Sequence, residues 1–189
     1  MEHSSRSHGT RGFAVAFAVL GFLLEEPRHG YALRARIEDG LGPLWRIASS
    51  QLYKVLHRLE TDGWLKRAAA PPDAGPPRSV YTVTQAGADA FRQWIAEPVT
   101  AMRNVRVEFV AKLYFARLLK ITPVAGLIDR QLIAVDRMRR HLEADDRATS
   151  DDGVLNAAWL AFQQTTLTHF ADWLRDQKSS LQSSKEIQP

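Results

Sequence analysis

Apolar side chains recur at helical spacing in the stretch between Ile47 and Asp62. Four of them fall at i, i+3, i+4 and i+7, which is one face of a helix: Leu52, Val55, Leu56 and Leu59. The helix is expected to begin near Ser49 and to stop at Asp62–Gly63. Its other face is polar and basic. The pattern predicts a helix that packs on one side and offers the opposite side to an anionic partner.

Two further helices are expected before this one. A long apolar run predicts a helix over about 12–24 that is buried on nearly all sides. Pro27 interrupts the pattern, and a second helix follows over about 30–39, with Gly40 just after its end. Its apolar positions are Tyr31, Leu33 and Ile37. A loop then closes on a short extended piece at Arg46–Ile47.

The pattern changes after Gly63. Residues 71–77 hold four prolines and one glycine, so this segment predicts a loop. Residues 80–83 favour strands, and the simplest arrangement is a two-stranded hairpin with a long tip. Thr84 can cap a fourth helix. The inner side of that helix carries Ala88, Phe91, Trp94 and Ile95.

Three helices, a hairpin and a fourth helix are the layout of a winged helix-turn-helix, which we expect at residues 11–97. In that fold the third helix enters the major groove of DNA, and the hairpin, or wing, lies beside it along the backbone. The expected fold class is mainly α with a small β-hairpin wing, followed by an all-α C-terminal dimerisation domain at residues 100–178. Residues 1–10 and 179–189 are polar and are expected to be disordered tails.

The C-terminal half predicts three helices. The first covers about 102–120, and Thr122–Pro123 starts the second, with Thr as its cap. The stripe of the second is Ile128, Leu132, Val135, Met138 and Leu142. The third runs over about 152–177 with the stripe Leu155, Trp159, Phe162, Thr166, Phe170 and Trp173. One helix cannot cover so much aromatic surface alone, so we expect it to pack on the other two and on a second chain.

Composition narrows the classes of function. The chain has 189 residues and no cysteine, which excludes disulfides, cysteine-ligated zinc and a thiol nucleophile. It shows no glycine-rich phosphate loop, no metal-ligand histidine spacing and no supported Ser/His/Asp arrangement, so we expect no enzyme activity, no cofactor and no metal. The net charge of +4 permits an anionic partner. From Arg46 to Arg67, five Lys or Arg residues stand against two acidic ones.

The N-terminus offers two interpretations. Arg6 and Arg11 precede the apolar run 13–24, as in a secretory signal peptide. The run is only twelve residues long, ends in Glu25–Glu26 and lacks a small-x-small cleavage pattern. We therefore favour a buried helix in a cytoplasmic protein without a membrane segment.

Three stretches of the sequence resemble the PadR-type bacterial transcription regulators. The matching residues occur in the family's order and spacing between His29 and Gly87: His29, Gly30, Tyr31, Leu52, Tyr53, Leu56, Leu59, Glu60, Gly63, Gly75, Arg78, Tyr81, Thr84 and Gly87. The family often has a Ser or Thr cap where this chain has Ala48, so we expect the cap at Ser49. The resemblance implies a DNA-binding transcription regulator, more often a repressor than an activator, that binds a palindromic operator as a homodimer.

The candidate DNA-binding residues lie on the third helix and the wing. They are Ser49, Ser50, Gln51, Tyr53, Lys54, His57, Arg58, Lys66, Arg67 and Arg78. The two serines begin the helix, where backbone N–H groups favour phosphate, and Gln51 can pair with adenine. Lys54 and Arg58 are neighbours on one side of the helix and suit a phosphate or a guanine edge.

Plainer interpretations of these residues stay open. Either serine can be only a helix cap, the basic face can be only solvated, and the sequence assigns no role to His57. Wing cations are expected to contact phosphates, which positions a protein without reading sequence. Tyr81 is equally suited to the core and to the DNA backbone.

The resemblance also implies a small hydrophobic or aromatic effector that releases DNA. The candidate residues for an effector pocket or dimer interface are Trp94, Phe109, Tyr114, Phe115, Trp159, Phe162 and His169. The alternative to an effector pocket is that all of them make plain core or dimer contacts. The competing function is a winged helix used only for protein–protein contact. Lys54, Arg58 and Arg78 argue against that alternative, because such a module needs no basic face.

Overall fold

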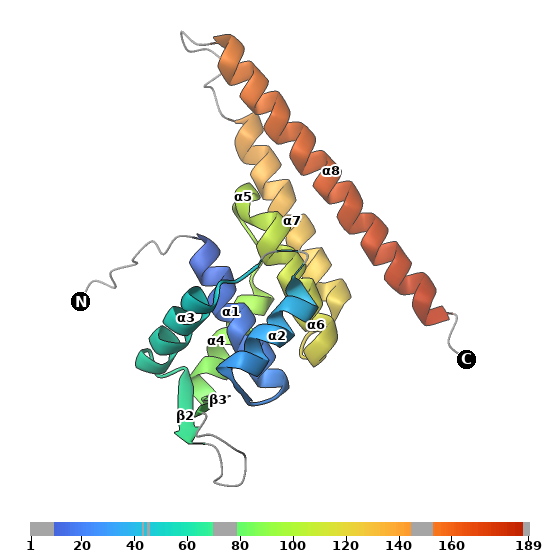
Figure 1. Ribbon diagram of the computed structural model, residues 1–189. Coiled ribbons are helices and arrows are strands. Elements are labelled where there is room, and N and C mark those ends of the chain that lie inside the picture. The colour runs from blue at the N-terminus through green and yellow to red at the C-terminus, as the bar shows by residue number, and fades with distance from the viewer. Residues whose placement is uncertain (1–9, 43, 45, 70–78, 145–152, 187–189) are drawn as a thin grey trace, which may run out of the picture. The chain divides into compact units, whose positions relative to one another are not determined.

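A computed structural model describes residues 10–42, 44, 46–69, 79–144 and 153–186 (Figure 1). The chain forms two compact units. The first joins the residues up to Ala96 with Arg106–Ile121, and the second joins Glu97–Val105 with the residues from Thr122 onward.

The first unit is built around α1, Thr10–Glu25, which contacts α2, α3, α4 and α6. These helices span Gly30–Leu41 (α2), Ser49–Thr61 (α3), Gln85–Ala96 (α4) and Val110–Leu119 (α6). In α1 the side chains of Phe17, Leu20 and Phe22 are buried, so the expectation of a helix covered on nearly all sides is confirmed. Phe17 stacks on Trp94 of α4 with 4.8 Å between ring centroids.

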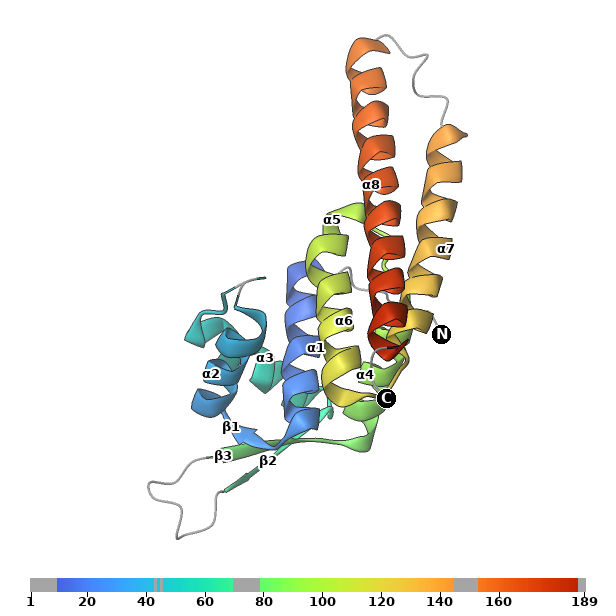
Figure 2. The same cartoon turned by 90° about the vertical axis from the view of Figure 1, so that its right-hand side faces the viewer.

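A three-stranded antiparallel sheet completes this unit (Figure 2). Strand β3, Ser79–Val83, lies between β2, Leu65–Ala69, and β1, Arg28–His29. The β2–β3 pair confirms the predicted hairpin, whose tip at residues 70–78 lies outside the described residues. The third strand is an addition, because two residues after a proline carry no strand signal, and Arg46–Ile47 is not a strand.

Two helix starts differ from expectation. The N-cap position of α3 is Ala48, whose side chain makes no capping hydrogen bond. Ser49 is therefore not the cap; it lies in the first turn, and its Oγ accepts a hydrogen bond from Arg34 Nη1 at 2.9 Å. Thr84 does cap α4, because its Oγ1 accepts from the Gly87 N–H at 3.2 Å. Thr122 does not cap the second C-terminal helix, whose N-cap position is Pro123.

Helix α2 also departs from its predicted pattern. It continues through Gly40 to Leu41, so Gly40 does not end it. Leu33 and Ile37 are buried as expected, but the side chain of Tyr31 is 73% exposed. Tyr31 comes two residues before Leu33 and six before Ile37, and at about 100° per residue these intervals place it well away from the buried side of α2.

The N-terminal part of the first unit ends at Ala96, near the predicted boundary, but the chain returns to this unit with Arg106–Ile121. The helix expected over 102–120 consists of α5, Met102–Asn104, a π-helical turn over Val105–Phe109, and α6. Its part from Arg106 onward belongs to the first unit. The cause is aromatic packing, because Phe115 meets Phe22 and Phe91 edge-on, with centroids 5.0 and 5.5 Å apart.

The second unit is a long helical hairpin of α7, Val124–Glu143, and α8, Gly153–Glu186 (Figures 1 and 2). Helix α7 buries Leu127, Ile128, Gln131, Ala134 and Val135, and α8 buries Leu167, Ala171 and Leu174. Gln131 holds the connector that precedes α5, since its side-chain amide bonds both the N–H and the carbonyl of Val99 at 2.7 and 2.8 Å. Among the described residues, every helix is too short or too polar to cross a membrane.

Candidate nucleic-acid interface

Helix α3 has two faces of different chemistry. Leu52, Leu56 and Leu59 are buried against the rest of the first unit. The other side is exposed and carries Ser49, Ser50, Gln51, Tyr53, Lys54, His57 and Arg58. All seven residues predicted on this helix therefore lie on its solvent side, where a partner can reach them.

The N-terminal end of α3 leaves backbone donors for a partner. The first N–H groups of a helix have no acceptor inside the helix. Since Ala48 supplies no capping side chain, none of these donors is used by the N-cap residue. Ser50 and Gln51 are exposed in the same turn. Uncapped N–H groups at the positive end of a helix favour an anion such as phosphate.

The cations of α3 differ in their surroundings. Arg58 Nε lies 3.4 Å from Asp62 Oδ2, so part of its charge is compensated. Lys54 is exposed and has no ion-pair partner in the part of the chain that the structure describes. His57 is exposed, and its backbone carbonyl accepts a hydrogen bond from Thr61 Oγ1 at 2.9 Å. Lys54 is thus the freest of these groups to meet an anion.

The wing presents its cations on two sides. Lys66 and Arg67 are both exposed and are adjacent in β2, so their side chains point to opposite faces of the sheet. Arg67 Nε lies 3.2 Å from Glu60 Oε1 of α3. Arg78, the third predicted wing cation, lies outside the described residues.

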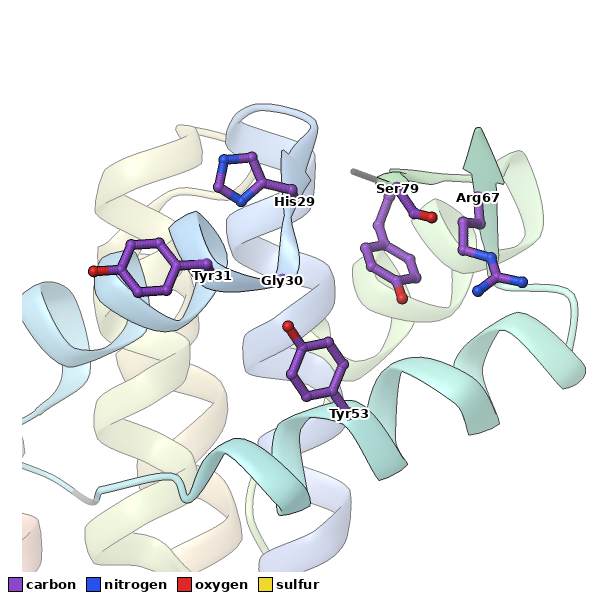
Figure 3. A pocket seen from close by; sticks show the side chains of 7 residues that line it. His29, Gly30, Tyr31, Tyr53, Arg67 and Ser79 are labelled. Carbon is purple, nitrogen blue, oxygen red and sulfur yellow. The ribbon is translucent and has the colours of Figure 1, made fainter. Parts of the chain in front are cut away.

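A hollow of about 600 Å³ lies where the start of α2, the side of α3 and the wing meet (Figure 3). It is lined by His29, Gly30, Tyr31, Tyr53, Arg67, Ser79 and Tyr81. Of these residues, Tyr53 and Arg67 were candidate DNA contacts from the sequence, and Tyr81 was suited either to the core or to the DNA backbone. His29–Gly30–Tyr31 stood out as a motif without a role, because nothing in the local pattern places it beside α3 and the wing.

Comparison with known proteins identifies the segment that holds this surface. The sequence model of a family described as "Transcriptional regulator PadR-like family" matches residues 19–93, which include α3 and the wing strands. This segment, which is less than half of the chain, is similar to the PadR-like family. The predicted resemblance is confirmed.

Two relatives of this PadR-like chain are curated proteins. A probable transcriptional regulator of Mycobacterium tuberculosis is 29% identical over 93 residues, which are 49% of this chain and 49% of the relative. The negative transcriptional regulator PadR of Bacillus subtilis is 26% identical over 116 residues, 61% of this chain and 64% of the relative. The chain therefore matches between about half and two thirds of their length. Both names describe regulators of transcription.

Solved structures of transcriptional regulators are similar as well. Bacillus subtilis PadR in complex with operator DNA is 20% identical, and the match covers 88% of this chain and 98% of that one with a TM-score of 0.44. A transcriptional regulator from Clostridium thermocellum is 28% identical over 44% of this chain and 79% of its own, with a TM-score of 0.40.

The seven candidate effector residues of this PadR-like chain are not gathered within one unit. Trp94, Phe109 and Phe115 are buried in the core of the first unit, and Tyr114 is half-buried beside them. Trp159, Phe162 and His169 are exposed on α8 in the second unit. The helical spacing of apolar residues predicted a stripe on each helix. It did not predict which part of that stripe is buried within the helix's own unit.

The core of the first unit also contains a buried ion pair. Lys112 is 1% exposed, and its Nζ lies 3.2 Å from Glu108 Oε1. The same carboxylate oxygen accepts a hydrogen bond from Trp94 Nε1 at 3.1 Å. Trp94 is thus tied into the packing of α4 against α6 and offers no open lining. Within the described ranges, no cluster of His, Asp and Glu is arranged to hold a metal ion.

Proposed function

We propose that this PadR-like regulator binds double-stranded DNA through the exposed face of α3 and the wing. The observation that carries the proposal is the division of α3 into a buried leucine side and an exposed side with uncapped N–H groups, Gln51, Lys54 and Arg58. A helix of this kind suits the major groove. Gln51 would read a base, and Lys54, Arg58, Lys66 and Arg67 would contact phosphates or guanine edges.

The proposed binding form is a homodimer on a palindromic operator. The support is on α8, where Trp159 is 55% and Phe162 is 62% exposed, with their ring centroids 6.1 Å apart. Val154 and Leu155 extend the same apolar surface. Large exposed aromatic patches mark protein–protein interfaces. A second copy of α8 would cover the patch, and a two-fold dimer would place two α3 helices roughly 34 Å apart, one DNA turn.

The proposed direction of regulation is repression. It rests on the relative from Bacillus subtilis, whose name is "Negative transcriptional regulator PadR". A bound dimer would then block transcription from the operator. A reporter gene behind that operator would become more active when the regulator is deleted; an unchanged or weaker signal would contradict repression.

Release by a small hydrophobic or aromatic effector belongs to the same proposal. The second unit has a hollow of about 270 Å³ with apolar and polar lining, formed by Thr100, Met102, Met138, His141, Leu142, Gln163 and Leu167. Ligand sites combine these two kinds of lining. Small aromatic compounds that raise the unfolding temperature and weaken DNA binding together would support an effector. Compounds that change neither would count against one.

A gel shift across a salt series tests DNA binding itself. The probe is the promoter region next to the protein's own gene. A protein that neutralises several phosphates should lose affinity by orders of magnitude between about 50 and 200 mM salt. Absence of any shift at low salt would contradict DNA binding and favour the alternative of a protein–protein interaction module.

A further inference from the structure

The hollow between α2, α3 and the wing combines three features that act on anions. It is formed by parts of the chain far apart in sequence, at residues 29–31, 53, 67 and 79–81. Figure 3 shows that the Tyr53 side chain extends from α3 toward Gly30 and that the Arg67 side chain extends from the wing toward α3. None of the seven lining residues is acidic. The hollow therefore offers donors without a carboxylate in its wall.

Tyr81 is the first feature. Its side chain is only 8% exposed, yet it lines the hollow. Its hydroxyl has no hydrogen-bond partner among the described residues. The hydroxyl is not among the buried polar atoms that lack a partner, so it opens onto the hollow. The unused donor at the wall of an open hollow points to a ligand oxygen.

Arg67 is the second feature. It is the register partner of Tyr81 across β2 and β3, so both side chains lie on one face of the sheet. Its Nε is held by Glu60 at 3.2 Å. The Arg67 side chain is 52% exposed, so its guanidinium is also open to solvent and to a ligand. Glu60 thus acts as a positioning residue that leaves the outer edge of the guanidinium for a bidentate phosphate contact.

The start of α2 is the third feature. His29 caps this helix, because its Nδ1 accepts a hydrogen bond from the Ala32 N–H at 3.1 Å. Gly30 follows at the first helical position, and an added Cβ there would lie 2.8 Å from the Tyr53 ring. The missing side chain lets α2 and α3 approach, which places the positive end of a 12-residue helix in the wall of the hollow.

We propose that this hollow binds one backbone phosphate of the DNA strand beside the groove that α3 enters. The Tyr81 and Tyr53 hydroxyls and the terminal nitrogens of Arg67 donate to the phosphate oxygens, and the start of α2 adds its positive end. The inference rests on the proposed DNA binding and goes beyond it by assigning His29, Gly30, Ser79 and Tyr81 to a phosphate site. A phosphate held from three elements fixes the register of α3 along the duplex.

The test uses the full-length protein and a duplex of about 30 base pairs, selected by the wild-type protein from a random-sequence library. Each phosphate of this duplex is replaced in turn by an uncharged methylphosphonate. Wild-type affinity should fall about tenfold at one particular phosphate per binding site. Arg67→Gln should remove that sensitivity, weaken binding to the unmodified duplex about tenfold and lower the salt slope by about one. Tyr81→Phe should weaken binding by a similar factor without changing the slope, because it removes no charge.

Matched controls lie close by in the same unit. Thr82→Val removes a hydroxyl from the next residue of β3, which points to the opposite face of the sheet. Arg92→Gln removes an exposed arginine that is paired with Asp89, as Arg67 is with Glu60, but lies on α4. Both should bind the duplex as the wild type does. If Tyr81→Phe fails to fold, the exposed Arg67→Gln variant still decides the question.

Three results would overturn the inference in distinguishable ways. If the wild-type protein selects and binds no duplex, the proposed function fails and this site fails with it. If the wild type binds but both variants keep its affinity and its sensitivity to the one phosphate, only the hollow's role is wrong. If inorganic phosphate at constant ionic strength stabilises the wild type but not Tyr81→Phe, while both bind DNA equally, the hollow is a free-anion site instead.

Discussion

Helices α3 and α8 are both amphipathic, but they use their apolar faces differently. Helix α3 buries all three of its stripe leucines inside the first unit and exposes only its polar side. Helix α8 buries a narrow line of Leu167, Ala171 and Leu174 and exposes larger side chains, Trp159 and Phe162. A helix whose apolar face is fully covered needs no partner for stability, so its free side is available for binding.

The difference assigns separate tasks to the two regions. The exposed area of α3 is polar, and its burial against DNA would be governed by charge and hydrogen bonds. The exposed area of α8 is apolar, and its removal from water would drive association of two chains. Substitutions on the buried side of α3 should act on stability alone, and substitutions on α8 should act through protein concentration.

The largest effect is expected at Leu56, which is fully buried. Leu56→Ala should lower the free energy of unfolding by about 2–5 kcal/mol, because it removes core volume and leaves a cavity. Urea denaturation followed by circular dichroism measures the change. The neighbouring exposed position serves as control, and His57→Ala should be nearly neutral. Unchanged stability in Leu56→Ala would show that the buried face of α3 is assigned wrongly.

A charge in the exposed stripe of α8 should have the next largest effect. Trp159→Glu is expected to weaken self-association by at least about 2 kcal/mol, since interface tryptophans are frequent hot spots. Sedimentation equilibrium should then detect monomer where the wild type is dimeric. Gln164→Glu adds the same charge on the side of α8 turned away from Trp159 and should leave the dimer intact. If the wild-type protein is monomeric, the assignment of the exposed apolar side of α8 as a dimer interface is wrong.

On the polar side of α3, Lys54→Ala should leave folding intact and weaken DNA binding by about 1–3 kcal/mol. If Lys54 reads a base, the loss should depend on the sequence at one operator position. If it contacts a phosphate, the loss should be uniform across sequences, with a smaller salt slope. Affinities for a set of single-position operator variants separate the two. Full affinity for every sequence would exclude Lys54 from the interface.

The smallest expected effect is the loss of stability when an ion pair inside the first unit, between Arg36 and Glu25, is removed. Arg36 donates two hydrogen bonds to the Glu25 carboxylate, at 2.9 and 3.0 Å, and this contact lowers the pKa of Glu25 below its ordinary 4.5. A lowered pKa in the folded chain means that the pair stabilises fully above pH 4.5 and loses its contribution as the pH falls through the folded value.

Glu25→Gln should therefore cost less than about 1 kcal/mol at neutral pH and nothing in strong acid. Stability curves of the two proteins against pH measure the difference. Because the pair lies inside one unit, the difference should not change with protein concentration, unlike the effect of Trp159→Glu. A gap between the curves that grows toward low pH would contradict the assignment.

Much of this architecture could be predicted from local pattern. Leu52, Leu56 and Leu59 occur at helical spacing, so α3 and its buried side followed directly from the sequence. The sequence also predicted the Thr84 cap and the hairpin before it. Such signals are local because capping, turn and periodicity rules involve residues within one or two turns of each other.

Other features depended on packing between distant residues. The helix segment from Arg106 joins the first unit because Phe115 fits between Phe22 and Phe91, and no local rule gives that choice. Tyr31 was counted among the apolar positions of α2, but it lies off the buried side that Leu33, Ile37 and Leu41 form. Ser49 was suited to the N-cap position of α3, but that position is Ala48. The Ser49 hydroxyl instead accepts a hydrogen bond from Arg34.

The order of amino acids alone predicted the winged-helix layout, the two faces of α3 and the resemblance of residues 19–93 to the PadR-like family, because each is encoded in short-range spacing. Only folding in three dimensions decided that His29, Tyr53, Arg67 and Tyr81 would border one hollow. These residues come from one helix end, one helix side and two strands. Their meeting depends on strand register and helix contacts, which are set by the balance of packing over the whole unit.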